Sequence, residues 1–176
     1  MTLAVKAHLP LAVALGHAFA RPTGCTIRLH RRDGDDWVAC AVHMSENDLI
    51  REEALKGPVQ ARVASLEASI SRDVEAGVLA FVRQGNRYRH RLTLKPVGGP
   101  SRSAVDGSDT ADSWAHQIGA TLVTLADRSD IDRADLFLAA PVEVAVLVGS
   151  WTNAVGEVLL MDWGKTGPFS RMWSLP

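Results

Sequence analysis

The sequence predicts an α/β fold in which helices cover a mostly parallel sheet. Apolar strand-like runs alternate with helix-like segments near both ends of the chain, which is the pattern of β-α-β units. The run 134–140 (ADLFLAA) is almost continuously apolar, as expected for a strand at the centre of a parallel sheet. With 176 residues, the chain can form one domain or two very small lobes with a buried core.

The first half of the chain is expected to mix strands and helices. Pro10 suits the first turn of a helix, and Ser45 with Asp48 fits a capping box. Apolar residues at 63, 66, 70 and 74 share one face of a helix. We therefore expect a strand over 5–9, a helix from Pro10 to the turn at 21–24, strands over 25–32 and 37–42, helices over 45–56 and 63–77, and strands over 78–82 and 87–97.

The second half opens with a loop, 98–113, that is rich in Gly, Ser, Asp and Pro and divides the chain unequally. An amphipathic helix is expected over 114–128, because Trp114, Ile118, Leu122 and Leu125 share one face. The remaining expected elements are a strand over 134–140, a helix from Pro141 to Gly156 and a strand over 157–163.

The segments 10–29 and 141–161 resemble one another. Each has a proline at a strand exit, then an apolar helix that contains a glycine (Gly16 or Gly149), then a strand, with two extra residues between proline and glycine in the second copy. The match predicts close packing of each helix at its glycine, although two unrelated β-α-β units would look similar. A genuine repeat would make the N-terminus a folded unit rather than the secretion signal that 1–22 also resembles.

Composition and motifs exclude several classes of function. A net charge of −1 argues against a protein that coats duplex nucleic acid, and the opening apolar run is shorter than a membrane span. Cys25 and Cys40 lack zinc-site spacing and indicate a reduced, cytoplasmic protein. The run 164–166 resembles the end of a phosphate-binding loop, but Leu159 occupies the position of its first glycine. The sequence therefore predicts no catalytic residue, metal or cofactor.

The residues do suggest a binding site where strands lead into helices. A helix start presents free backbone N–H groups and the positive end of the helix dipole to an anion, although alanine and proline can also form a plain tight turn. Tryptophan rings could stack on a base. Clusters of arginines, among them those at 83–91, could contact phosphate or simply be solvated. The candidate ligand-binding residues are His8, Pro10, Leu11, Arg31, Arg32, Trp37, Ala139, Ala140, Pro141, Val142, Trp163 and Lys165.

The C-terminal part of the chain resembles the SAVED family. In that family a strand ends in a small-small-Pro turn and leads into a helix with Ala and Gly, then an Asn. Here the turn at 139–141, Ala145, Gly149 and Asn153 match, whereas Met161-Asp162 stands where the family has a Tyr-Glu pair. The N-terminal segment 9–37 resembles the first half of the same family.

The resemblance implies two fused CARF-like, Rossmann-type lobes, here expected over 1–97 and 114–176 around a flexible loop, 98–113. It implies a sensor of a cyclic di-, tri- or tetranucleotide in CBASS or type III CRISPR antiphage defence. The ligand would lie between the lobes, drive head-to-tail self-association and activate a fused or separate effector. Two alternatives remain open: a nucleotide-acting enzyme such as a ring nuclease, and an interaction subunit that assembles without ligand.

Overall fold

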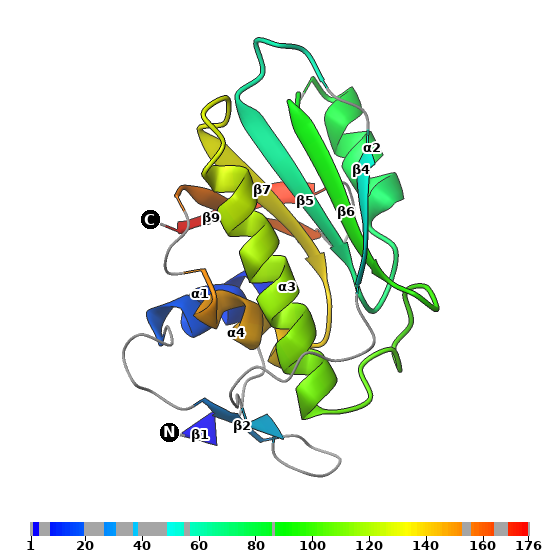
Figure 1. Cartoon of the computed structure of the whole chain (residues 1–176), viewed down its shortest axis with the longest axis vertical. Helices are drawn as coiled ribbons and strands as arrows, with labels where there is room; N and C mark the ends of the chain where they lie inside the picture. Colours follow the sequence, from blue (N-terminus) through cyan, green and yellow to red (C-terminus); the bar gives the residue numbers. More distant parts are fainter. Residues whose placement is uncertain are drawn as a thin grey trace.

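The computed structural model describes residues 2–3, 8–19, 27–30, 37–38, 49–54, 57–85, 87–152, 156–163 and 169–175. It shows an α/β arrangement of two sheets and four helices (Figure 1). The small sheet has the order β1 (Thr2–Leu3), β2 (Arg28–Leu29), β3 (Trp37–Val38). The large sheet has the order β4 (Leu49–Ala54), β6 (His90–Pro96), β5 (Val63–Ser69), β7 (Arg133–Ala139), β8 (Val158–Trp163), β9 (Phe169–Leu175). The helices are α1 (Leu9–Ala18), α2 (Glu75–Arg83), α3 (Ser108–Ala126) and α4 (Val142–Ser150).

The four inner strands of the large sheet, β6, β5, β7 and β8, run parallel, and the outer strands β4 and β9 run antiparallel to them. The inner strands therefore all end at one edge, which we call the C-terminal edge; the opposite edge is the N-terminal edge. In open α/β sheets, ligands bind at the C-terminal edge, where the loops after the strands converge.

The two faces of the large sheet are covered by different helices. Ala64, Leu66 and Ala68 of β5 belong to one core cluster with α3 and α4. Phe137 and Ala139 of β7 point to the other face and pack with α2. Figure 1 shows α3 crossing the sheet and α1 beside α4. The main core thus lies between the sheet and the α3/α4 layer.

The strand β5 replaces the helix expected over 63–77, so that prediction is wrong. Both faces of β5 are covered, and Ser65, Glu67 and Ser69 are as buried as the apolar residues between them. Buried polar residues between apolar ones produce a spacing of three and four, which is the pattern of an amphipathic helix. The spacing of the apolar residues therefore indicates a helix, although the segment is a central strand of the sheet.

Two neighbouring predictions are also wrong. The segment expected as a helix over 45–56 contains the edge strand β4, in which Leu49 is buried and Ile50 is 43% exposed. The segment expected as a strand over 78–82 lies in α2, whose Val78 and Phe81 are buried. Leu9 belongs to α1 rather than to a strand, and the rest of the predicted strand over 5–9 falls on residues outside those described, except His8.

Several predictions are confirmed, among them the strands β6, β7 and β8 and the helices α3 and α4. The loop expected over 98–113 ends earlier, because α3 already begins at Ser108. The segments on either side of this loop contribute to one sheet, since β5 pairs with β7 over the register Val63↔Arg133 to Ser69↔Ala139. The boundary expected between the two lobes at this loop therefore falls between two strands of the same sheet.

The glycines of the internal repeat bring α1 and α4 together. A Cβ atom on Gly16 would lie 1.9 Å from the carbonyl oxygen of Val146, and one on Gly149 would lie 2.0 Å from that of Val13. Each valine precedes the glycine of its own helix by three residues, so the two contacts are reciprocal. The close approach expected at these glycines is confirmed for a helix–helix contact.

The helix starts show which positions of the repeat are equivalent. Gly16 lies eight residues after the N-cap His8, and Gly149 lies eight residues after the N-cap Pro141. The two N-caps have nearly the same backbone angles, φ −64° and ψ 147° against φ −54° and ψ 148°. Pro141 is therefore equivalent to His8 rather than to Pro10, which removes the two-residue mismatch between the copies.

Candidate functional site at the C-terminal edge

Backbone hydrogen bonds tie three loops together at the C-terminal edge. The N–H groups of Ile70 and Ser71, just after β5, both donate to the carbonyl oxygen of Ala139 at the end of β7, at 2.9 and 2.8 Å. The N–H of Ser101, in the loop after β6, donates to the carbonyl oxygen of Ile70 at 3.0 Å. The exits of β5, β6 and β7 thus form one connected surface rather than three independent loops.

The turn from β7 into α4 lies at the centre of this surface. Ala139 and Ala140 are 2% and 7% exposed, so both residues, backbone included, are almost wholly covered by the protein. Pro141 caps α4, and Val142 is its first residue. The first amides of an α-helix have no acceptor within the helix, so this end of α4 can receive an anion.

The corresponding start of α1 is arranged differently. His8 is exposed, Pro10 is buried and Leu11 is 50% exposed. The carbonyl oxygen of His8 accepts the first helical hydrogen bond, from the N–H of Ala12 at 3.0 Å. The contact between α1 and α4 is made at Gly16 and Gly149, eight residues beyond the two N-caps, and not at the helix starts. The start of α1 places an apolar side chain, Leu11, at the surface.

Trp163, at the end of β8, is held from several sides. Its ring is perpendicular to that of Phe169 (87°, centroids 4.9 Å apart), and a Cβ on Gly77 of α2 would lie 2.0 Å from the ring. The guanidinium carbon of Arg72 lies 4.8 Å from the ring centroid. The side chain is 38% exposed. A base that stacks on this ring must therefore share it with, or displace, the Arg72 guanidinium.

The remaining predicted site residues lie elsewhere. Trp37 is 5% exposed and packs in the main core, so a base could reach its ring only after that core opened. Arg31, Arg32 and Lys165 lie outside the described residues. Arg72 was missed from the sequence because 63–77 was assigned to a helix. A correct strand assignment would have placed this arginine directly after a central strand.

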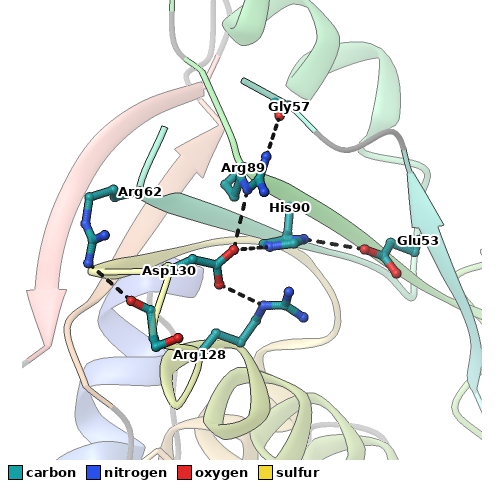
Figure 2. A network of polar contacts seen from close by, with 8 residues as sticks. Glu53, Gly57, Arg62, Arg89, His90, Arg128 and Asp130 are labelled. Carbon is teal, nitrogen blue, oxygen red and sulfur yellow. Dashed lines mark hydrogen bonds and ion pairs between the residues drawn. The ribbon is translucent and has the colours of Figure 1, made fainter. Parts of the chain in front are cut away.

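The N-terminal edge holds a dense ionic network (Figure 2). The ring of His90 is 2% exposed; its Nε2 lies 3.0 Å from Asp130 and its Nδ1 3.4 Å from Glu53. Arg89 and Arg128 contact Asp130 at 3.4 and 3.3 Å. The hydrogen bond with His90, together with those from the two arginines, lowers the pKa of Asp130 well below its usual range. The network joins β4, β6 and the turn before β7.

A consequence of the Asp130 contacts is a stability loss in acid. A carboxyl whose pKa is lowered in the folded state stabilises the fold above its unfolded pKa, near 4, and this stabilisation disappears as the pH falls below that value. We expect the urea midpoint of the wild type to fall between pH 5 and pH 3. The Asp130→Asn variant should start lower and show a smaller fall. Asp127→Asn, which changes an exposed carboxylate nearby, is the control and should behave as the wild type. Equal acid sensitivity of Asp130→Asn and wild type would contradict this role.

The basic group at 83–91 is divided by the structure. Arg91 makes two hydrogen bonds to the buried carboxylate of Glu67, at 2.9 and 3.2 Å, and Arg89 is paired with Asp130. Arg83 and Arg87 are exposed. The two paired arginines are therefore occupied by carboxylates of the protein.

A cavity of about 310 Å³ lies between α3, the outer strand β4 and its neighbour β6. It is lined by Leu49, Arg51, Leu94, His116, Gln117, Ala120 and Thr121. The side-chain oxygen of Gln117 accepts the N–H of Leu49 at 3.0 Å, which ties α3 to the edge strand. Within the described part of the chain, no group of three or more acidic, His or Cys side chains could hold a metal ion, and no helix there is long and apolar enough to cross a membrane.

Several solved structures with a similar fold are SAVED/CARF-domain containing receptors. The structure of the Acinetobacter baumannii Cap4 SAVED/CARF-domain containing receptor with the cyclic trinucleotide 3′3′3′-cAAA is similar to this chain with a TM-score of 0.81 and 18% identity. The match covers 98% of this chain and 38% of that one. The same receptor with 2′3′3′-cAAA gives 0.80 and 16%, over 98% and 38%. The Moraxella osloensis Cap4 SAVED/CARF-domain containing receptor gives 0.69 and 18%, over 99% and 37%.

No curated protein sequence matches the chain. The chain spans well under half the length of the receptors that it resembles. The family model described as "SMODS-associated and fused to various effectors sensor domain" matches residues 2–175, which is nearly the whole sequence. The mostly parallel sheet, the small-small-Pro turn after β7 and the paired helices α1 and α4 agree with this match. The chain therefore belongs to the SAVED family of sensor domains.

Proposed function

We propose that this chain is a sensor module that binds a cyclic oligonucleotide at the C-terminal edge of its large sheet. The observation that carries the proposal is the family match over residues 2–175, joined to the similarity with receptor structures that contain cyclic trinucleotides. The geometry supports it, because strand exits, a helix start and a partly exposed tryptophan come together at this edge. A cyclic di-, tri- or tetranucleotide offers the phosphates and bases that such an edge can receive.

In this proposal the ligand meets the start of each repeat helix. Phosphates approach the helix starts at Leu11 and Val142, and the buried turn of Ala139 and Ala140 positions the start of α4. The proposal is supported by the equivalent N-cap positions of His8 and Pro141 in the two repeat helices. Arginines of the edge would neutralise part of the phosphate charge.

We further propose that ligand binding drives head-to-tail self-association in the cytoplasm and activates an effector, either fused to this domain or separate. The relatives are much longer than this chain, which leaves room for such an effector in proteins of this kind. The domain itself is proposed to act without catalysis. A receptor releases its ligand unchanged, whereas a ring nuclease would release linear products.

The test combines binding with product analysis. The protein is titrated with cyclic di-, tri- and tetranucleotides, starting with 3′3′3′-cAAA, and the ligand is recovered and separated by chromatography. The proposal predicts a saturable thermal shift with at least one member and recovery of an intact ring, with an increase in light scattering on binding. Linear products would identify an enzyme. Full assembly before any ligand is added would indicate a structural interaction subunit, and no shift with any member would reject the sensor proposal.

A further inference from the structure

Arg72 occupies an unusual place among the arginines of this fold. It follows β5 at the C-terminal edge, and its guanidinium lies over the ring of Trp163 at the end of β8. Within the described part of the chain, this ring contact is the interaction that Arg72 makes; no carboxylate lies within ion-pair distance of it. By contrast, five arginines of the described residues pair with carboxylates. They are Arg62 (with Asp132), Arg89 and Arg128 (both with Asp130), Arg91 (with Glu67) and Arg133 (with Asp135).

The acidic residues next to Arg72 are already engaged. Asp73 and Glu75 lie 3.5 and 3.6 Å from the ammonium nitrogen of Lys95, on β6. The side chain of Asp73 also accepts the N–H of Glu75 at 2.8 Å. Lys95 therefore neutralises part of the local negative charge, and the positive charge of Arg72 remains available to an anion from outside the chain.

The backbone around Arg72 is held by hydrogen bonds, and its exposed side chain lies against one aromatic ring. The loop that carries it is bonded at both ends: Ser71 donates to Ala139, and the Ser69 hydroxyl accepts the N–H of Val74 at 3.1 Å. The Trp163 ring beneath the guanidinium is itself wedged against Gly77 and Phe169. A cation held in this way loses little conformational entropy on binding.

A second arginine lies on the adjoining loop. Arg102 is exposed, directly follows Ser101, whose N–H is bonded to Ile70, and has no described ion pair. The loops that carry Arg72 and Arg102 therefore meet at Ile70, beside the turn into α4. Two guanidinium groups without a described carboxylate partner, carried on adjoining loops, offer the charge and the planar donors that phosphodiester groups require.

We infer that Arg72 and Arg102 form a phosphate-binding pair at the C-terminal edge, with the ring of Trp163 as the support that positions Arg72. The inference rests on the proposed function and makes it more specific, since it assigns phosphate contacts to residues outside the helix starts. It also changes the role of Trp163: the ring holds a phosphate-binding arginine, and stacking on a base is not required of it.

The test compares arginine variants by titration with 3′3′3′-cAAA, or with whichever cyclic di-, tri- or tetranucleotide binds the wild type most tightly. Arg72→Ala is expected to weaken binding about 10- to 100-fold, because a charge-assisted contact is lost. It should also lower the slope of log Kd against log salt concentration by about 0.7, which is the value for one phosphate contact in a single-stranded nucleic acid. Arg102→Ala should act in the same direction. Arg72→Lys keeps the charge but loses the planar contact with Trp163, and should fall between wild type and alanine.

Arg83→Ala is the matched control, because Arg83 is an exposed arginine at the far end of α2. It should leave Kd and the salt slope unchanged, and the melting temperature of every variant should stay close to that of the wild type. If the wild type binds but Arg72→Ala keeps the same Kd and salt slope, the inference is wrong and the sensor proposal survives. If the wild type binds no cyclic nucleotide of the panel, the sensor proposal fails, and the inference with it.

Discussion

Gly149→Ala is expected to lower the free energy of unfolding by about 3 kcal/mol, the upper range for overpacking a core. The new Cβ would lie 2.0 Å from the carbonyl oxygen of Val13 and 2.8 Å from the backbone nitrogen of His17. Both are backbone atoms, so α1 must move as a whole. Helix propensity alone predicts the opposite sign, a gain of about 1 kcal/mol for glycine to alanine. The steric cost of the new Cβ is larger than this gain, so Gly149→Ala should be less stable than the wild type.

The measurement is urea unfolding followed by circular dichroism. Gly16→Ala should cause a similar loss, because its Cβ would lie 1.9 Å from the carbonyl oxygen of Val146. The double variant should lose less than the sum of the two, since both replacements push the same pair of helices apart. Gly98→Ala is the control, because a Cβ there meets no atom within 4 Å. An unchanged or higher stability of Gly149→Ala would show that α1 and α4 are not packed as described.

Arg91→Ala is expected to cost about 3 kcal/mol at pH 8, because it leaves the carboxylate of Glu67 buried without its partner. Glu67 is 0% exposed and is held by two hydrogen bonds from Arg91 and one, at 3.3 Å, from Ser65. Burial raises the pKa of Glu67, and the contacts with Arg91 and Ser65 oppose this rise. Without Arg91 the pKa must rise further.

The pH dependence of this loss has a definite sign. A carboxyl whose pKa is raised in the folded state costs stability as the pH rises from its unfolded value, near 4.5, through its folded value. The deficit of Arg91→Ala should therefore be smaller at pH 5 than at pH 8 in urea unfolding. Adding Glu67→Gln to Arg91→Ala should recover part of the loss, because no charge remains buried. Arg62→Ala, which removes an exposed ion pair, should change stability little. A variant Arg91→Ala as stable as the wild type at pH 8 would contradict the assignment.

The parts of the fold that follow local rules could be predicted from the sequence. The run that becomes β7 is apolar on both faces, and the proline after Ala140 ends it, so the strand–helix boundary is clear. The glycines at 16 and 149 are costly within helices, and their cost indicates a close contact. The identity of the contact, one helix against the other, comes only from the structure.

The parts that depend on distant partners could not be predicted. In β5 the buried carboxylate of Glu67 is stabilised by Arg91 from the neighbouring strand β6. Nothing local distinguishes such a carboxylate from an exposed one, so the segment has the pattern of a helix. That error also hid Arg72, whose importance depends on its place directly after a central strand. Trp163 was identified from its position at a strand end, but its partners Gly77 and Phe169 come from α2 and β9, and β9 was not predicted.

Hydrogen exchange of the backbone amides, with and without bound cyclic nucleotide, tests the central claim most directly. Amides at 70–73 and 142–144 border the proposed site, and those in the first turn of α4 have no helical acceptor. The account predicts that ligand slows exchange in both segments and leaves the N-terminal edge, at 57–62 and 128–132, unchanged. Protection confined to the N-terminal edge, under conditions where binding is saturated, would show that the ligand site lies elsewhere.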